Sequence, residues 1–528
     1  MSTPPSPPTD DALAAARPRS APSVALGDVA RWVGAQGPAG ADGADGVAVR
    51  GVTLSTRRVA PGDLYAALPG ARAHGADFAA DALAAGAVAV LTDPDGAARL
   101  VAAGGAGVPV LTVPDPRAVL GSLAARLHGR PAERMATVAV TGTQGKTTTT
   151  RLAEAALTAA GTPAAVVGTV GTRVRGVDVP TSLTTPEAPD LHGLFARMVE
   201  DGVEVCAMEV SSHALVLGRV DGVVFDVAVF TNLGRDHLDF HADVEEYFAA
   251  KASLFTPQRA RRALVNVDDE HGRRLVGLAA EAGLEVRTFS LRPGAADWWV
   301  DDVVAEPEGS RFTVHGPGGA VETTTVPLPG DFNVANALAA LAALVEAGQD
   351  LAAVADGLAR SGGVPGRLER VDVGQDFTLV VDYAHKPDAV AAALSTLRPL
   401  TSGRVLLVLG AGGDRDPGKR PLMGRIGAEL ADVLVVTDDN PRTEDPAAVR
   451  AAVLAGAAEV PEDTRAQVVE IGDRRAAVRH AVTAARPGDI VVVAGKGHET
   501  GQEVAGVVHP FDDRVVAAEE ARAVQERR

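Results

Sequence analysis

Residues 141–147 form a segment whose residue types suit the binding of nucleotide phosphates. It reads TGTQGKT and lies between a β-branched run, expected to be a strand, and a stretch expected to be a helix. Backbone N–H groups of such a turn can surround phosphates, the Lys146 ammonium can reach the β- and γ-phosphate oxygens, and the Thr147 hydroxyl can bind Mg²⁺. The usual phosphate loop has a glycine where this chain has Val140, and a glycine-rich turn without a ligand is the alternative. We predict an ATP site formed by Gly142, Thr143, Gln144, Gly145, Lys146, Thr147 and Thr148.

Two more polar clusters follow predicted strands. Glu209 ends one apolar run, and residues 231–241, which read TNLGRDHLDFH, end another. Both clusters are expected at the same sheet edge as the phosphate loop, because open α/β sheets bind ligands at the carboxyl ends of their strands. Mg²⁺ takes carboxylate oxygens beside nucleotide phosphates, so Glu209 is a candidate metal ligand. His237, crowded among polar residues, is a candidate site residue, whereas the pattern around His213 and His241 suits a structural role equally well.

The composition restricts the class of protein. The 528 residues carry 50 Lys+Arg against 68 Asp+Glu, a formal net charge of −18, and 46% of them are apolar. An acidic balance disfavours generic nucleic-acid binding, which depends on cations that neutralise phosphates. No apolar run reaches the roughly 18–20 residues that a membrane helix needs, and the single cysteine, Cys206, cannot form an intramolecular disulfide. We therefore expect a cytoplasmic protein that acts on small molecules and binds neither nucleic acid nor membrane.

Lysine and asparagine are rare. The chain has five lysines, which leaves 50 − 5 = 45 arginines. Where the sequence keeps lysine, the position is expected to need its compact ammonium or its nucleophilic amine. Arginine supplies neither, because its guanidinium is planar and stays protonated. Chance retention on a solvated surface is the alternative for any single lysine. The lysines are Lys146, Lys251, Lys386, Lys419 and Lys496, and the asparagines are Asn232, Asn266, Asn333, Asn336 and Asn440.

The order of the predicted elements indicates an α/β fold of three domains. Residues 1–23 are rich in proline and are expected to be a disordered tail. Short strand-like runs alternate with alanine-rich helical stretches over 24–133, which predicts a small α/β domain. Residues 134–362 begin with strand, turn and helix and continue as a doubly wound domain with a mostly parallel sheet. A break at SGGVPGR precedes a third alternating set over 363–528, expected to be Rossmann-like.

A series of motifs in this order resembles the Mur ligase family from about residue 50 to the C-terminus. The motifs include TGTQGKTTT, LTTPEAPDL, MEVSSHAL, FTNLGRDHLDFH, VDYAHKPDA, GGDRDPGKRPLMG, DDNPRTEDP and AGKGHE. The resemblance implies ATP-driven peptide-bond formation in peptidoglycan synthesis, through an acyl phosphate. Within the family the chain is similar to the members that add meso-diaminopimelate to UDP-N-acetylmuramoyl-L-alanyl-D-glutamate. The three domains would then bind the UDP substrate, ATP with Mg²⁺, and the amino acid.

The resemblance also implies roles for individual residues. Lys251 matches a lysine that the family carbamylates into a ligand for a second Mg²⁺ beside His237, and Thr147 and Glu209 match positions around the first. Lys146, Lys251 and His237 would be catalytic. Nucleotide contacts are implied for Asn336, Arg367 and Asp382, and UDP-substrate contacts for Ser55, Thr184, Thr185, Ser211 and Arg219. Two positions depart from the family: Leu217 stands where many relatives carry glutamine, and LSTR at 54–57 replaces an Asp-Ser-Arg pattern around Ser55 and Thr56.

Arg442 is the residue that bears on which amino acid the protein adds. Diaminopimelate has two carboxylates and two amines, so a selective site should offer a guanidinium that grips a carboxylate with two hydrogen bonds. Arg442 follows a predicted strand in a motif typical of diaminopimelate-adding relatives; a loop salt bridge is the alternative. The resemblance implies an amino-acid site formed by Arg415, Asp439, Asn440, Arg442, Gly495 and Glu499.

Other functions remain open from the sequence. A lysine-adding relative and a folylpolyglutamate synthetase share the ATPase motifs, but Arg442 and the long first domain argue against both. A phosphate-loop nucleotide switch would not need Lys251 together with His237. A degenerate relative that binds the precursor without catalysis is a further alternative. We expect a monomer.

Overall fold

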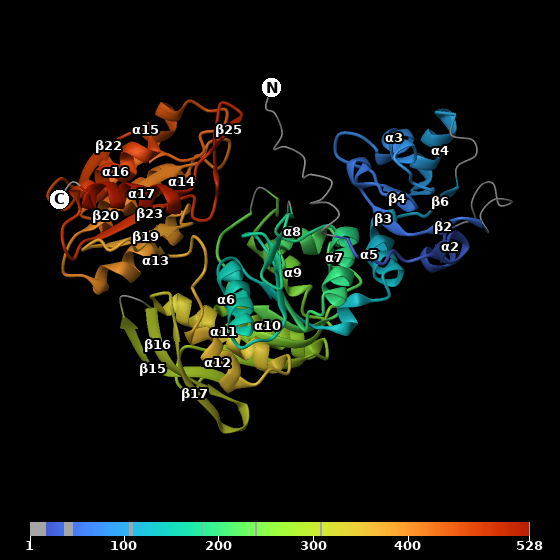
Figure 1. Ribbon diagram of the computed structural model, residues 1–528, viewed down its shortest axis with the longest axis horizontal. Helices are drawn as coiled ribbons and strands as arrows, with labels where there is room; N and C mark the ends of the chain where they lie inside the picture. Colours follow the sequence, from blue (N-terminus) through green and yellow to red (C-terminus); the bar gives the residue numbers. More distant parts are fainter. Residues whose placement is uncertain are drawn as a thin grey trace.

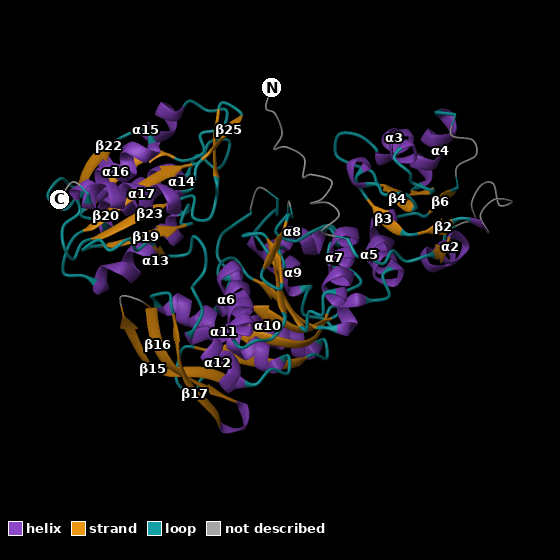
Figure 2. Ribbon diagram, viewed as in Figure 1, coloured by secondary structure: helices purple, strands orange, loops and turns teal. Residues whose placement is uncertain are grey.

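The computed structural model describes residues 17–35, 46–104, 109–181, 183–237, 240–306 and 309–526. It has three α/β lobes in chain order, and Figure 1 shows the middle lobe between the other two. Helices and strands are interleaved in each lobe (Figure 2). No helix in these ranges is long and apolar enough to cross a membrane. The predicted α/β class with mostly parallel sheets is confirmed.

The first lobe is built on a small parallel sheet in the order β3-β4-β5-β6, next to a two-stranded β1-β2 ladder. The buried aliphatic residues of these strands pack against α2 and α5. The elements are β1 (Val24–Ala25), α2 (Leu26–Val33), β2 (Ala48–Val49), β3 (Gly51–Thr53), β4 (Asp63–Ala67), α3 (Ala79–Ala84), β5 (Ala89–Thr92), α4 (Pro94–Ala102), β6 (Val110–Thr112) and α5 (Pro116–Leu127).

The middle lobe contains an eleven-stranded sheet in the order β10-β9-β8-β11-β7-β12-β13-β14-β15-β16-β17. Its central strands are parallel, and their apolar residues are buried on both faces of the sheet, as expected of strands covered by helices on both sides. The elements are β7 (Ala136–Thr141), α6 (Lys146–Ala159), β8 (Ala164–Val167), β9 (Thr172–Val174), β10 (Val177–Val179), α7 (Ala188–Glu200), β11 (Val205–Glu209), α8 (Ser212–Val216), β12 (Phe225–Phe230), α9 (Val244–Ala252), β13 (Ala260–Asn266), α10 (Glu270–Glu281), β14 (Glu285–Ser290), β15 (Trp298–Glu306), β16 (Gly309–Gly316), β17 (Ala320–Val326), α11 (Asp331–Glu346) and α12 (Leu351–Ala359).

Both edges of this sheet depart from a doubly wound arrangement. Strands β9 and β10 continue the sheet antiparallel beyond β8, and strands β15, β16 and β17 are antiparallel at the other edge. The connection between β16 and β17 is residues 317–319, which is too short for the crossover that parallel strands need. Gly318 and Gly319 have positive φ values of 73° and 80°, so this connection turns the chain back directly.

The third lobe has a six-stranded sheet in the order β18-β19-β23-β20-β21-β22, parallel except for the edge strand β18. A separate hairpin, β24-β25, follows the sheet. The elements are β18 (Glu369–Arg370), β19 (Thr378–Asp382), α13 (Pro387–Leu397), β20 (Val405–Ala411), α14 (Lys419–Leu430), β21 (Val433–Asp438), α15 (Pro446–Ala458), β22 (Gln467–Glu470), α16 (Arg474–Ala484), β23 (Ile490–Ala494), β24 (Gly501–Val504), β25 (Val507–Pro510) and α17 (Asp513–Gln525).

The predicted tail falls only partly within the described residues. Residues 1–16 lie outside them. Arg17 forms an ion pair with Asp63 of the first lobe (2.8 Å), and Arg19 forms one with Asp201 at the end of α7 in the middle lobe (2.8 Å). This short segment therefore contacts both lobes.

Candidate active site

The phosphate loop joins the carboxyl end of β7 to the first turn of α6. Gly142 and Gly145 have φ values of 147° and 89°, which L side chains rarely adopt, and a Cβ on Gly145 would collide with a side chain of α11. Contacts after β12 hold the loop: Gln144 N donates to Asn232 Oδ1 (2.9 Å), and Thr231 Oγ1 donates to Gln144 O (2.6 Å). The predicted strand, turn and helix are present.

Lys146 is the first residue of α6 and reaches back over the loop. Its Nζ donates to the backbone carbonyls of Gly142 (2.8 Å) and Thr143 (3.1 Å). Burial lowers the pKa of its ammonium, and the nearby Glu209 carboxylate opposes that shift. Thr148, in the first turn of α6, is buried. The ammonium is therefore positioned at the loop, where phosphate oxygens would lie.

Oxygen atoms gather beside the loop at the end of β11. Glu209 is 1% exposed, and its Oε1 accepts hydrogen bonds from Thr147 Oγ1 (2.9 Å) and Thr169 N (2.8 Å). A carboxylate next to a hydroxyl is a donor set that suits Mg²⁺. Among the described residues no group of three His, Cys, Asp or Glu side chains could hold a metal ion. A cation here would therefore need the Thr147 hydroxyl and ligand oxygens as well as Glu209.

Lys251 lies on α9, one turn after Tyr247, and is 1% exposed. Its Nζ donates to Gly142 O (2.8 Å) and lies 4.5 Å from the centroid of the Tyr247 ring. Burial, and secondarily the charge of Lys146, lowers the pKa of Lys251 well below its ordinary value. A buried amine with a lowered pKa is neutral more of the time and hence a better nucleophile.

His237 follows β12 with a left-handed backbone (φ 52°) and lines the same cavity as Lys251. Its Nε2 is 3.4 Å from Asp236 Oδ2, and burial lowers its pKa to about 4. The ring centroids of His237 and His213 are 4.8 Å apart. His241 is buried, with Nε2 3.0 Å from Ser212 Oγ. Its contact with Ser212 supports the structural interpretation for His241.

A cavity of about 750 Å³ lies between the middle and third lobes. It brings together most of the residues predicted for nucleotide, metal and UDP substrate. Of those, the lining includes Thr143, Gln144, Gly145, Lys146, Thr147, Thr148, Thr184, Thr185, Glu209, Ser211, Arg219, His237, Lys251, Asn336, Arg367 and Asp382. Gly142 lies beneath Lys146 and Lys251, and its carbonyl accepts from both ammonium groups.

The predicted nucleotide residues come from both lobes. Asn336 of α11 lies against the phosphate loop, with Oδ1 3.5 Å from Thr149 Oγ1. The Arg367 guanidinium stacks 4.4 Å from the centroid of the Tyr383 ring, and its Nη2 is 3.4 Å from Thr147 Oγ1. Asp382 ends β19, and its carboxylate accepts from two backbone N–H groups; burial raises the pKa of this carboxyl although Arg367 opposes the shift.

The predicted UDP-substrate residues divide into two places. Thr185 Oγ1 donates to Glu209 O (2.8 Å), Thr184 Oγ1 lies 3.0 Å from Thr169 Oγ1, and Ser211 Oγ accepts from Ala214 N at the start of α8. Arg219 pairs through Nε with Glu187 Oε1 (2.8 Å). Ser55 lies in the first lobe and does not line this cavity. At the position of the family's glutamine, the Leu217 carbonyl accepts from Arg117 Nη1 (3.1 Å) of the first lobe.

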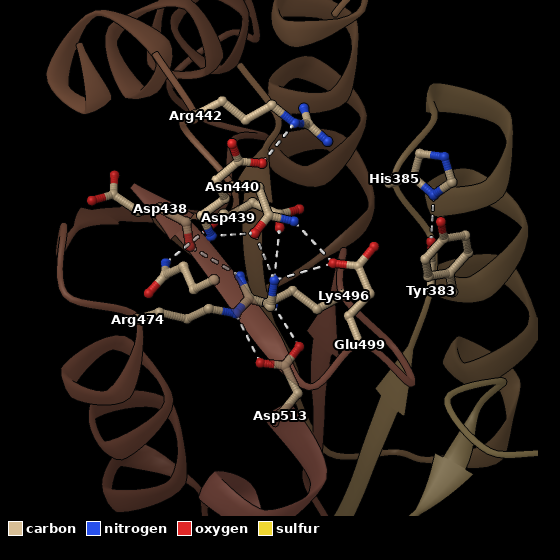
Figure 3. A network of polar contacts seen from close by, with 12 residues as sticks. Tyr383, His385, Asp438, Asp439, Asn440, Arg442, Arg474, Lys496, Glu499 and Asp513 are labelled. Carbon is tan, nitrogen blue, oxygen red and sulfur yellow. Dashed lines mark hydrogen bonds and ion pairs between the residues drawn. The ribbon is translucent and has the colours of Figure 1, made fainter. Parts of the chain in front are cut away.

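The residues predicted for the amino acid gather at the carboxyl ends of β21 and β23 (Figure 3). Asn440 Nδ2 donates to Glu499 Oε2 (2.9 Å). Gly495 has φ 120°, and a Cβ there would lie 2.7 Å from Asp439 Oδ2. Arg442 donates through Nη1 to Gly413 O, and its Nε is 3.6 Å from Glu503 Oε2. Arg415 is exposed in the loop between β20 and α14.

Sequence reasoning missed one cation of the site. Lys386, at the start of α13, pairs with Asp236 of the middle lobe at 2.5 Å and lines the cavity. Burial acts to raise the pKa of Asp236, but Lys386 and the hydrogen bonds to the carboxylate hold it below its ordinary value. The scarcity of lysine was the one sequence signal that could have identified this residue.

Four of the five lysines lie in, or directly after, the loops that follow strand carboxyl ends, and Lys251 reaches the phosphate loop from α9. Besides Lys146, Lys251 and Lys386, Lys419 Nζ donates to His385 O (2.9 Å), and Lys496 is fully buried beside Asn440. Two of the scarce asparagines also line the cavity: Asn266 Nδ2 donates to Thr231 O (2.8 Å), and Asn333 Nδ2 donates to Pro329 O (2.8 Å). The biased composition therefore marks the site.

Comparisons with known proteins cover nearly the whole chain. Residues 48–128 match a family model described as "Mur ligase family, catalytic domain", residues 140–344 match "Mur ligase middle domain", and residues 366–497 match "Mur ligase, glutamate ligase domain". A UDP-N-acetylmuramoyl-L-alanyl-D-glutamate--2,6-diaminopimelate ligase of Streptomyces avermitilis is 53% identical over 510 residues, which is 96% of this chain and 98% of the relative. A ligase of the same name from Corynebacterium glutamicum is 50% identical and covers 93% of this chain and 94% of its own.

Solved structures show the same arrangement. A structure of a UDP-N-acetylmuramoyl-L-alanyl-D-glutamate--2,6-diaminopimelate ligase superposes with a TM-score of 0.68 at 34% identity, over 95% of this chain and 99% of that one. MurF from Acinetobacter baumannii has a TM-score of 0.64 at 18% identity, over 96% of this chain and 99% of its own, which is a likeness of fold.

Proposed function

The chain belongs to the Mur ligase family, and from that premise we propose that it is an ATP-dependent ligase that joins meso-diaminopimelate to UDP-N-acetylmuramoyl-L-alanyl-D-glutamate. The ligation belongs to peptidoglycan synthesis and forms ADP and phosphate. The observation that carries the proposal is the cavity between the middle and third lobes. The phosphate loop, Lys251 and Lys386 line this cavity together with four of the five residues predicted for the UDP substrate, which supports the proposal.

The first step activates the substrate carboxylate. That carboxylate attacks the γ-phosphate of ATP, which breaks the bond to the β-phosphate oxygen and yields an acyl phosphate and ADP. Lys146 at the loop and Lys386 on the opposite lobe are the cations that would balance the charge on the transferring phosphoryl group. Asn336 and Arg367 would hold the nucleotide from α11 and from the connection into the third lobe.

Mg²⁺ suits the oxygens beside the loop. The Thr147 hydroxyl and Glu209 carboxylate, 2.9 Å apart, would hold one ion, and Lys251 as a carbamate with His237 would hold a second. Bound Mg²⁺ neutralises phosphate charge and orients phosphate oxygens. The carbamate is supported by the position of Lys251: its amine is buried, its pKa is lowered, and it donates to a backbone carbonyl. Arginine could not form a carbamate, which fits the retention of lysine here.

The second step joins the amino acid. The amine of diaminopimelate attacks the acyl phosphate, phosphate leaves, and the amine proton is released. Arg442 would bind a carboxylate of the incoming amino acid, with Arg415 from the neighbouring loop, while Gly495 and Glu499 would lie near its distal amine. Closure of the third lobe on the middle lobe would keep water from the acyl phosphate.

The test is phosphate release by the purified protein, with the UDP dipeptide and a panel of amino acids. We expect release only when dipeptide, ATP, Mg²⁺ and diaminopimelate are all present, and no release with lysine in its place. Release with ATP alone would support a nucleotide switch, and preferential use of lysine would assign the chain to the lysine-adding relatives. Size-exclusion chromatography tests the proposed monomer.

A further inference from the structure

Lys496 is a charged residue of the third lobe to which the proposed reaction gives no role. It directly follows Gly495 at the carboxyl end of β23, and its side chain is 0% exposed. Burying an ammonium is costly unless polar partners surround it. Its partners therefore indicate what it does.

Three acceptors surround the ammonium. Lys496 Nζ donates to Asn440 Oδ1 (3.0 Å) and to Glu499 Oε2 (3.2 Å), and it lies 3.6 Å from Asp439 Oδ1 (Figure 3). Asp439 Oδ1 is itself buried and has no hydrogen-bond partner within the described ranges. A lysine ammonium carries three N–H donors arranged as a compact point charge, which suits three acceptors from different directions better than a planar guanidinium would.

These contacts fix the orientation of the Asn440 amide. Its Oδ1 accepts from Lys496 Nζ and from Glu503 N (3.0 Å), so its Nδ2 must face Glu499, to whose Oε2 it donates. Glu499 Oε2 thereby receives two donors. The second carboxylate oxygen of Glu499 points away from this network, toward the side on which Tyr383 and His385 lie (Figure 3).

The charges of this group indicate which ligand it suits. Asp439 and Glu499 contribute two negative charges and Lys496 one positive charge, and the neighbouring ion pair of Arg474 with Asp513 adds no net charge, so this group keeps a net charge of −1. That balance suits a ligand with one additional ammonium group. A ligand carbon chain that ends without an amine would leave the outward oxygen of Glu499 without a partner, which disfavours its binding.

We propose that Lys496 is a positioning residue that sets the selectivity of the amino-acid site for a distal ammonium. It acts through Glu499, which it contacts directly and by way of Asn440, and it does not touch the reacting atoms. The inference rests on the proposed function, because it assumes that an amino acid binds at the ends of β21 and β23. It adds a basis for recognising the amine end of that amino acid, distinct from the carboxylate grip of Arg442.

The experiment compares diaminopimelate with L-2-aminopimelate, which has the same carbon chain and both carboxylates but no distal amine. In Lys496→Met we expect the ratio of the two kcat/KM values to fall by about 10–100-fold, as for the loss of hydrogen bonds to a charged group. The KM for ATP should change by less than about threefold. Arg479→Met is the matched control, because it removes a cation that pairs with Glu520 elsewhere in the lobe. Its ratio should stay at the wild-type value.

A second variant separates positioning from a general loss of structure. Glu499→Gln together with Lys496→Met removes one charge of each sign, so it is testable even where the single variant fails to fold. If Lys496 acts through Glu499, the double variant should have nearly the same substrate ratio as Glu499→Gln alone. An unchanged ratio in Lys496→Met, or further loss of the ratio in the double variant beyond Glu499→Gln, overturns the proposal. Absence of ligation with diaminopimelate in the wild-type protein would instead refute the proposed function.

Discussion

The ion pair between Lys386 and Asp236 joins the two lobes that form the cavity, and Lys386→Met would break it. The side chains are 33% and 15% exposed, and the nitrogen and oxygen are 2.5 Å apart. Methionine keeps the length and apolar stem of lysine but leaves the Asp236 carboxylate without this cation. We expect the closed arrangement of the lobes to become less populated.

The free energy contributed by the ion pair follows from its partial burial. A hydrogen bond to a charged group contributes about 1.5–3 kcal/mol when buried, and solvent screening at a side chain one-third exposed places this pair at about 1–2 kcal/mol. Since 1.36 kcal/mol is tenfold, loss of the ion pair alone should lower kcat/KM for the dipeptide about 5–30-fold, and loss of the Lys386 charge at the transferring phosphoryl group would lower it further. The pKa of Asp236 should rise in the variant, because burial is then no longer outweighed by Lys386.

Two assays test this reasoning. A double-mutant cycle with Asp236→Asn, followed by phosphate release, should give a coupling energy of about 1–2 kcal/mol. Small-angle X-ray scattering with ATP and dipeptide should show a larger radius of gyration for Lys386→Met than for the wild type. Arg261→Met is the control, because it breaks an exposed ion pair with Asp226 inside the middle lobe. Strictly additive effects of the two cavity variants, with unchanged scattering, would refute the idea that the pair holds the lobes together.

Three more outcomes are expected. Lys251→Arg should abolish ligation while the thermal unfolding midpoint stays within a few degrees of the wild type, because arginine cannot become a carbamate; full activity would exclude that role. Arg442→Ala should raise the KM for diaminopimelate at least about tenfold with little change for ATP, and an unchanged KM would contradict the carboxylate grip. His192 is fully buried and burial lowers its pKa from 6.5 to about 4, so the unfolded chain binds a proton more readily below pH 6.5 and stability should fall as the pH drops from 6.5 toward 4. His192→Gln should flatten this dependence in thermal melts between pH 4.5 and 7, and an equally steep profile in that variant would show that other groups dominate.

The sequence predicts features that depend on short segments. The phosphate loop, the end of β11 and the end of β12 meet because neighbouring parallel strands present their carboxyl ends at one edge, so Thr147 and Glu209 were expected together and are 2.9 Å apart. The scarcity of lysine is also informative, because each retained lysine reflects the chemistry needed at a single position. None of these predictions requires knowledge of how distant segments pack.

Contacts between distant segments were not predictable in this way. The pair of Lys386 and Asp236 depends on how two lobes are oriented, and the position of Ser55 outside the cavity depends on the orientation of the first lobe. Arg474, fully buried, pairs with Asp513 from α17, 39 residues away, and no motif marks either partner. The antiparallel strands β15–β17 differ from the doubly wound expectation because a three-residue turn decides their direction. These features follow from packing between elements.

The placement of the lysines means that chemical labelling of their side-chain amines can report on the state of the cleft. All five belong to the described residues and are buried or half-buried, whereas many arginines are exposed. Few lysine side chains on the outer surface would therefore react with an acylating dye. The slow labelling of the remaining lysines would follow the opening of the cleft. Protection of Lys386 from labelling when ligands are added would then report site occupancy in the unmodified protein, without an engineered probe.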